Sequence, residues 1–135
     1  MATYVLVLKT MEETNIHVGR LGNVFLKRGL FLYIGSAKKA LQKRVGRHLV
    51  KDKKLFWHID YILNSRKVSI IEVWTKEADQ ECETACIIDN FTGAMVVRKG
   101  LGSSDCRCPA HFYFFGGDVS EIRNLLERNG FSVLR

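Results

Sequence analysis

Short apolar runs separated by short polar gaps are the feature that most limits how this sequence can fold. Residues 4–8 and 30–34 are dense in β-branched, aromatic and leucine side chains, which is typical of buried strands. Between them, residues 16–19 alternate in polarity, Gly22-Asn23 is a turn signal, and residues 24–26 are again apolar. These gaps are too short for the crossover helices that parallel strands need. We therefore predict antiparallel strands connected by hairpins, with residues 16–19 as the return strand after residues 4–8.

Helical spacing of apolar residues appears only after this first part of the chain. Leu41, Val45 and Leu49 recur at helical intervals within residues 37–50. The remaining expected helices are residues 56–63 with a buried face of Ile59, Ile62 and Leu63, residues 79–89 with a stripe of Cys82, Ala85 and Cys86, and residues 119–128 capped by Asp118; further strands are expected at 68–74, 95–97 and 111–115. The predicted fold class is α+β, a small and mostly antiparallel sheet flanked by helices. A chain of 135 residues fits a single domain, residues 1–135.

The positive charge of the chain is concentrated in one stretch. Residues 38–54 contain eight basic residues and one acidic residue, an excess equal to the net charge of +7 of the whole chain. A localised basic patch attracts polyanions such as nucleic acids, although the same charge could serve a solvated surface, an acidic protein or an anionic membrane. Because no long apolar span or signal sequence accompanies it, we expect no membrane role and a cytoplasmic location.

The segment Tyr33-Ile34-Gly35-Ser36 stands where an apolar strand meets this basic stretch. Glycine at the end of the strand would let a substrate backbone approach closely, and Ser36 is a good N-cap for the helix that follows. Lys38 and Lys39 then add charge where the helix N-terminus is already positive. This pattern predicts an anion site, with phosphate as the first anion to consider.

Four cysteines raise the question of disulfides or metal. Without a secretory signal we expect reduced thiols. Cys106-Arg107-Cys108 followed by His111 could hold zinc with Cys82 or Cys86 as a fourth ligand. The Cys-x-Cys spacing is tighter than zinc sites usually show, so we do not expect structural zinc.

With these residues placed, the sequence resembles the GIY-YIG endonuclease superfamily. The Tyr33-Ile34-Gly35 motif matches letter for letter, and Arg44 with His48 fits the pattern of the helix after it. The first family motif is degenerate, because Ala2-Thr3-Tyr4 keeps only the tyrosine. Similarity extending through Trp57-His58-Ile59-Asp60-Tyr61, Glu81-Cys82 and the segment 102–108 points to a poorly characterised prokaryotic branch, some of whose relatives are fused to a DNA-repair glycosylase.

The resemblance implies metal-dependent hydrolysis of DNA phosphodiester bonds. The implied catalytic residues are Tyr4 and Tyr33, which activate a water, Arg44, which binds the phosphate, and His48. A phenol acts as a base near neutral pH if cations lower its pKa, which the basic helix could supply. One glutamate would hold Mg²⁺ or Mn²⁺ together with waters. The residues expected to contact nucleic acid are Gly35, Ser36, Lys38, Lys39, Lys43, Arg47 and His58.

The choice of glutamate does not follow from periodicity. Glu81 and Glu83 both flank the predicted buried stripe. We favour Glu81 because Glu-Cys is the pair shared with the branch. The family's closing asparagine has no evident counterpart; Ser104 or Asp105 stands near its place.

Each candidate also has a purely structural interpretation. The tyrosines could be sheet aromatics, Arg44 a partner in a surface salt bridge, His48 a cap at the helix C-terminus, and His58 a buried hydrogen-bonded histidine.

The leading functional prediction is a metal-dependent DNA endonuclease acting in repair, with DNA and a repair protein as partners. The degenerate first motif and the missing asparagine motivate the alternative, a non-catalytic nucleic-acid-binding module on the same scaffold. A third hypothesis is a zinc-stabilised protein-interaction domain that uses the basic face.

Overall fold

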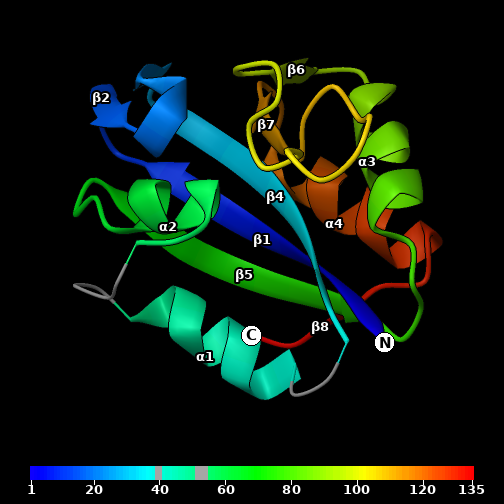
Figure 1. The fold of residues 1–135 in the computed structure, drawn as a ribbon. Helices are drawn as coiled ribbons and strands as arrows, with labels where there is room; N and C mark the ends of the chain where they lie inside the picture. Colours follow the sequence, from blue (N-terminus) through cyan, green and yellow to red (C-terminus); the bar gives the residue numbers. More distant parts are fainter. Residues whose placement is uncertain (39–40, 51–54) are drawn as a thin grey trace.

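The computed structural model describes residues 1–38, 41–50 and 55–135. The strands are β1 (Ala2–Thr10), β2 (Thr14–His17), β3 (Asn23–Leu26), β4 (Gly29–Ala37), β5 (Val68–Lys76), β6 (Ala94–Val96), β7 (Phe112–Phe115) and β8 (Ser132–Val133). The helices are α1 (Leu41–Leu49), α2 (His58–Leu63), α3 (Glu81–Asp89) and α4 (Val119–Arg128), with a 3-10 turn at Gly19–Leu21. In this part of the chain six strands form one sheet in the order β6-β7-β4-β1-β5-β8, and β2 and β3 form a separate ribbon (Figure 1). All neighbouring strands are antiparallel, which confirms the predicted α+β class.

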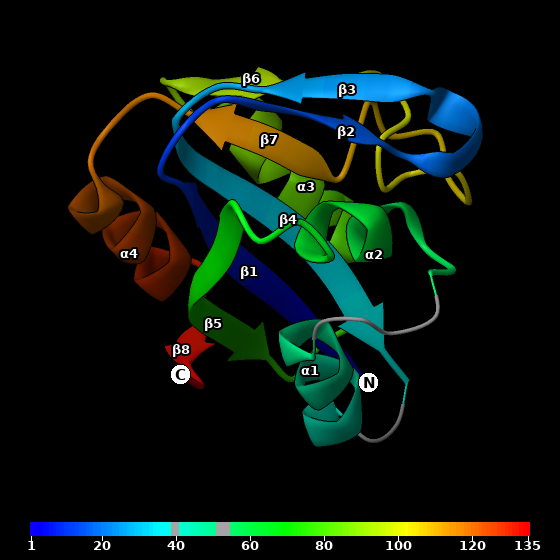
Figure 2. The ribbon, with the colours of Figure 1, turned by 90° about the vertical axis from the view of Figure 1, so that its left-hand side faces the viewer.

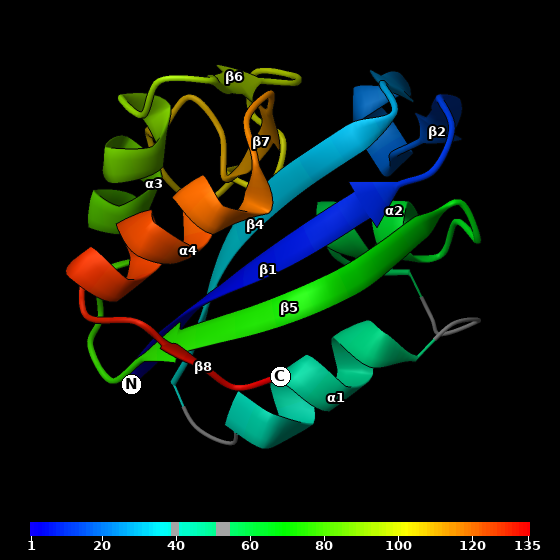
Figure 3. The same ribbon diagram turned by 180° about the vertical axis from the view of Figure 1, so that it is seen from behind.

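The central strand β1 is buried on both faces because both faces of the sheet are covered. Tyr4, Leu6 and Leu8 point into a core shared with α1, α2 and the β2-β3 ribbon. Val5 and Val7 point into a second core shared with α3 and α4. Figures 2 and 3 show these two sets of elements on opposite sides of β1 and β4. A strand covered on both faces appears in the sequence as a continuous apolar run, as residues 4–8 do.

The pairing of β1 corrects the predicted hairpin. The segment after β1 pairs with β3 and not with β1. β1 instead pairs along its whole length with β4 and also pairs with β5. Nine-residue strands can satisfy each other's backbone groups over their full length, which the four-residue β2 cannot do for β1.

Two local predictions about helices are also wrong. Ser36 does not cap α1, because β4 continues to Ala37 and Ser36 pairs with Thr3 in the sheet. The buried residues of α3 are Thr84, Ala85 and Ile88, while Cys82 and Cys86 are exposed. Compared with the predicted orientation, α3 is rotated about its axis. Ile88 therefore packs in the second core, and Cys82 faces away from it.

Other expectations are confirmed. Ile59, Ile62 and Leu63 form the buried face of α2. Helix α4 begins after Asp118, whose backbone N–H donates to Oε1 of Glu121 at 3.0 Å, the arrangement of a capping box.

Candidate functional site

A pocket of about 610 Å³ opens where β4, α1, the segment before α2, the start of α3 and the loop after β6 meet. It gathers residues that are far apart in the sequence and that the sequence analysis had selected, including Tyr33, Arg44 and Glu81. The full lining is Tyr33, Ser36, Arg44, Phe56, Trp57, His58, Glu81, Gly102, Ser104 and Asp105. In the described part of the chain, the tertiary structure thus brings five of the twelve predicted site residues into this pocket, namely Tyr33, Ser36, Arg44, His58 and Glu81.

Tyr4 and His48 form a buried pair beside Tyr33. Tyr4 is 1% exposed and His48 is 2% exposed. The Tyr4 hydroxyl lies 2.7 Å from Nε2 of His48, a hydrogen-bonding distance. The Tyr33 ring lies 6.3 Å from the Tyr4 ring and 6.1 Å from the His48 ring, centre to centre. His48 stands in the last turn of α1, and its contact with the Tyr4 hydroxyl gives it a role beyond that of a helix cap.

Gly35 has a structural role that the sequence did not indicate. It is the strand partner of Tyr4 in the β1-β4 pairing. A β-carbon at residue 35 would collide with the Tyr4 ring, including its hydroxyl oxygen. Glycine is needed here so that the Tyr4 side chain can cross β4 toward His48. Close approach of a substrate backbone at Gly35 remains a prediction.

The pKa values of Tyr4 and Tyr33 are raised, whereas the sequence led us to expect lowered values. Burial raises the pKa of Tyr4 well above its ordinary value, and the nearby Arg44 opposes this only in part. Burial likewise raises the pKa of Tyr33. The prediction that the basic helix would lower these pKa values is wrong in direction, because desolvation outweighs the attraction of Arg44. Both phenols are protonated at neutral pH.

Two arginines of α1 lie over the same indole. The guanidinium carbons of Arg44 and Arg47 lie 4.5 and 4.8 Å from the centre of a Trp57 ring. Arg44 lines the pocket. Arg47 instead forms a bidentate ion pair with Asp60, with nitrogen-oxygen distances of 2.6 and 3.0 Å. Arg47 thus anchors α1 to α2, and its contact with nucleic acid stays a prediction.

Asp60 is a structural residue that the sequence analysis used only as part of the resemblance. Its side chain is fully buried, and it also accepts hydrogen bonds from the backbone N–H groups of Phe56 and Trp57. Burial alone would raise its pKa, but Arg47 and these two donors hold the pKa of Asp60 below its ordinary value. The available sequence signal was an acid three residues after Trp57, the spacing at which a carboxylate can reach back to the backbone N–H of an N-cap residue.

Two acidic residues line the pocket, Glu81 and Asp105, and Glu81 is the one that the resemblance selects as the metal ligand. It is the first residue of α3 and lines the pocket, whereas Glu83 is exposed. Burial would raise the pKa of Glu81, but contacts with His111 and Ser36 and the charge of Arg44 hold it below its ordinary value. The carboxylate is therefore charged at neutral pH. The structure favours Glu81 over Glu83 as the acid of the site.

The basic residues of the predicted nucleic-acid surface are only partly described. Lys38 and Lys43 are exposed beside the pocket-lining Ser36 and Arg44 in the sequence. Lys39 and the basic segment 51–54 lie outside the described residues.

The loop between β6 and β7 forms one wall of the pocket. The Gly102 backbone N–H donates to Nδ1 of His58 at 3.0 Å. Burial lowers the pKa of His58, so its neutral form is favoured. Gly102 has φ of +77°, and a β-carbon there would lie 3.2 Å from the Tyr33 ring and 3.3 Å from Cβ of His111. The loop therefore passes directly over two site residues, a role for Gly102 that the Gly/Ser-rich composition alone could not specify.

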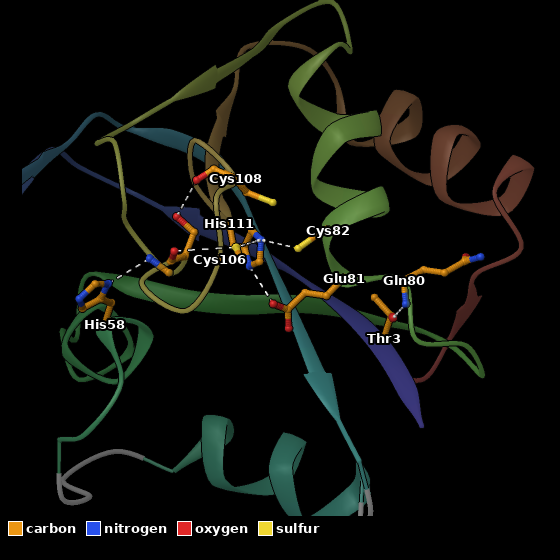
Figure 4. Close-up of polar contacts among 10 residues, drawn as sticks. Thr3, His58, Gln80, Glu81, Cys82, Cys106, Cys108 and His111 are labelled. Carbon is orange, nitrogen blue, oxygen red and sulfur yellow. Dashed lines mark hydrogen bonds and ion pairs between the residues drawn. The ribbon is translucent and has the colours of Figure 1, made fainter.

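The same loop and the start of α3 together carry a cluster of three thiols and one imidazole. The possible ligand atoms of Cys82, Cys106, Cys108 and His111 all lie within 4.8 Å of one another. Figure 4 shows Cys82 reaching from α3 toward the loop that carries the other three. Burial raises the pKa of the thiols of Cys82 and Cys108, the latter to about 12. The cysteines are free in the structure.

The family comparison covers nearly the whole chain. A family model described as "Domain of unknown function DUF123" matches residues 3–130, and the chain belongs to this family. Comparisons with curated proteins and with solved structures gave no match. Among the described residues, no helix is long and apolar enough to cross a membrane.

Proposed function

We propose that this protein is a metal-dependent endonuclease that hydrolyses DNA phosphodiester bonds and acts in DNA repair. The observation that carries the proposal is the convergence of Tyr33, Arg44 and Glu81 in one pocket, next to the Tyr4-His48 pair. The resemblance to the GIY-YIG endonucleases supports the same assignment. A cytoplasmic location fits this proposal, because free thiols such as those of the four cysteines persist there.

Arg44 is the proposed phosphate ligand. Its planar guanidinium matches two phosphate oxygens, and the Trp57 ring beneath it restricts its orientation. A restricted arginine loses less conformational freedom on binding a phosphate than a fully exposed one. Lys38 and Lys43 would add the longer-range attraction that draws DNA to this side of the molecule.

The tyrosines and His48 are the proposed proton-transfer groups. A protonated phenol cannot itself accept a proton from water, so Tyr4 needs an acceptor for its own proton. Nε2 of His48, 2.7 Å away, can serve as that acceptor in the tautomer that carries no proton on this nitrogen. We propose that a water in the pocket is oriented by Tyr33 and loses its proton toward the Tyr4-His48 pair as it attacks phosphorus.

Glu81 fits the requirements of a magnesium ligand. Its carboxylate is charged, partly exposed and turned to a pocket with room for several waters, and magnesium prefers a carboxylate combined with waters. Mg²⁺ or Mn²⁺ bound there would stabilise negative charge on the phosphate and the leaving oxygen.

A non-catalytic nucleic-acid-binding module is the alternative function. The observation that favours it is the burial of both tyrosines, which keeps them protonated. In this case Arg44 and the lysines would bind nucleic acid, and the Tyr4-His48 pair would be part of the core.

Nicking of supercoiled plasmid separates the two functions. The natural chain is assayed with Mg²⁺ and with Mn²⁺, alongside Glu81→Gln, Arg44→Ala and the matched control Glu83→Gln. Metal-dependent nicking that Glu81→Gln and Arg44→Ala abolish, and Glu83→Gln retains, supports the nuclease. Tight binding of DNA without nicking under either metal supports the binding module. Circular dichroism of each variant shows whether the fold survives.

A further inference from the structure

We propose that Cys82, Cys106, Cys108 and His111 form a closed four-ligand zinc site that fixes the loop between β6 and β7 to the start of α3. The proposal is independent of whether the protein cleaves DNA. It reverses the expectation from the sequence, which named Cys82 or Cys86 as a possible fourth ligand but judged the Cys-x-Cys spacing too tight for structural zinc.

The separations of the four ligand atoms fit a tetrahedral zinc ion. Zinc-sulfur and zinc-nitrogen bonds of about 2.3 and 2.0 Å place tetrahedral ligands roughly 3.5 to 3.8 Å apart. Nε2 of His111 lies 3.5 Å from Sγ of Cys106 and 4.0 Å from Sγ of Cys82, and all four atoms lie within 4.8 Å. Shifts of about 1 Å or less would complete the geometry. The Cys-x-Cys spacing of Cys106 and Cys108 is tighter than in usual zinc motifs, but Cys82 on α3 lies close enough to these residues to complete the ligand set.

The type of ligand selects the metal. Three thiolates and one imidazole are a soft donor set typical of structural zinc, whereas magnesium and calcium require oxygen. Four protein ligands fill the tetrahedron and leave no position for a substrate or a water. On binding, the three thiols release their protons to solvent and each sulfur forms a bond to zinc, while neutral His111 binds through Nε2. No oxidation or reduction takes place.

His111 is oriented as a metal-binding histidine. It is 1% exposed, and its Nε2 faces the sulfur atoms. Its other nitrogen, Nδ1, lies 3.0 Å from Oε2 of Glu81 (Figure 4). Histidine ligands commonly have a carboxylate at the second nitrogen, which fixes the ring and its tautomer. Glu81 is thus a positioning residue for this site in addition to its place in the pocket.

The loop itself gives an independent reason for a cross-link. Residues 97–111 contain no helix or strand, and long irregular loops are uncommon in compact domains unless something orders them. Within the loop Cys106 N–H donates to the Ser103 carbonyl and Ser103 Oγ donates to the Cys108 carbonyl, which curls the backbone so that the two thiols approach His111. The cysteines are not paired as disulfides. Zinc would order this loop and thereby the wall of the pocket that contains Gly102, Ser104 and Asp105.

Metal content and cobalt spectroscopy test the proposal. The full chain is purified under reducing conditions and its zinc is measured by elemental analysis. After zinc is removed with a chelator, Co²⁺ is added and its visible absorption is recorded, because tetrahedral cobalt thiolates absorb far more strongly than octahedral cobalt. Cys86→Ser is the matched control for Cys82→Ser, since both cysteines are exposed on α3 and only Cys82 belongs to the cluster.

We expect one zinc ion per chain and a tetrahedral thiolate spectrum in the natural protein and in Cys86→Ser. Cys82→Ser and Cys106→Ser should lose stoichiometric zinc, and Glu81→Gln should bind zinc roughly 10- to 100-fold more weakly. If the serine variants do not fold, His111→Cys should keep the metal and give a four-thiolate cobalt spectrum. The proposal is overturned if the natural chain holds no zinc and gives no thiolate spectrum, if it holds iron instead, or if Cys86→Ser loses metal as Cys82→Ser does.

Discussion

The hydroxyl of Tyr4, on the central strand, lies 2.7 Å from Nε2 of His48, on the helix α1. Both side chains are almost completely excluded from solvent. The hydrogen-bonding groups of a buried polar pair depend on each other, because no water reaches them to replace a lost partner. This contact therefore links the stability of the fold to the proposed chemistry.

Replacing Tyr4 by phenylalanine should separate these two contributions. The ring stays, so the packing is retained, and the loss of one buried hydrogen bond should lower the free energy of unfolding by about 1 to 2 kcal/mol. If the Tyr4-His48 pair transfers a proton, nicking should fall by roughly 10²- to 10⁴-fold. Urea unfolding and the plasmid assay measure the two effects, with Tyr61→Phe as a control outside the pocket. Nicking by Tyr4→Phe at the natural rate would remove Tyr4 from the mechanism.

Gly35→Ala should destabilise the protein by about 1 to 3 kcal/mol, because the new methyl group collides with the Tyr4 ring. Gly46→Ala is the matched control: Gly46 lies within α1 with open space around its α-carbon, so alanine should be neutral or stabilise by up to about 1 kcal/mol. Chemical denaturation measures both. The Gly35 effect should shrink in a Tyr4→Val background; an equal loss in both backgrounds would mean that the collision is not its cause.

Asp60→Asn should remove a pH-dependent part of the stability. The pKa of Asp60 in the folded protein lies below its ordinary value. Its contribution is therefore complete above the unfolded pKa of about 3.9 and is lost as the pH falls through the folded value. We expect Asp60→Asn to cost about 2 to 3 kcal/mol near neutral pH and progressively less in acid.

The control for this substitution is Glu72→Gln. Glu72 pairs with Arg123, which is about half exposed, and Gln keeps an acceptor for the Trp74 indole N–H. Solvent-exposed ion pairs contribute little, so its cost should be about 1 kcal/mol or less. Urea titrations at several pH values would contradict the assignment if the loss in Asp60→Asn were the same at all of them.

Lys43→Ala should weaken DNA binding and reduce its dependence on salt. Each phosphate contact contributes about 0.9 to the slope of log K against log salt concentration for duplex DNA. Loss of one lysine contact should lower the slope by about that amount. Lys9→Ala is the control, because Lys9 is exposed and lies at the end of β1 that is farther from Tyr4. Fluorescence anisotropy at several salt concentrations measures the slopes, and equal slopes for both variants would argue against the predicted surface.

The residues of the site were predicted from the resemblance to the GIY-YIG endonucleases, whereas local pattern predicted the strand and the helix that carry several of them. Tyr33 lies on a strand, and Arg44 and His48 lie one helical turn apart; these positions follow from alternation and helical spacing. The sequence could narrow the metal-binding acid only to Glu81 or Glu83, because which face of α3 is buried depends on the packing of Ile88 in the second core. The sequence indicated the structural role of Asp60 only weakly, because its main partner, Arg47, lies on another helix.

The sequence by itself determined the class of the fold, the apolar central strand, the buried face of α2, the capped start of α4 and the concentration of positive charge, since these depend on neighbours within a few residues. Only the tertiary structure decided the partners of β1, the need for glycine beneath the Tyr4 ring, the raised pKa of both tyrosines and the meeting of Cys82 with Cys106, Cys108 and His111. The physical reason is the same in each case: strand pairing, desolvation and ligand convergence are set by contacts between residues distant in sequence, which no local pattern encodes.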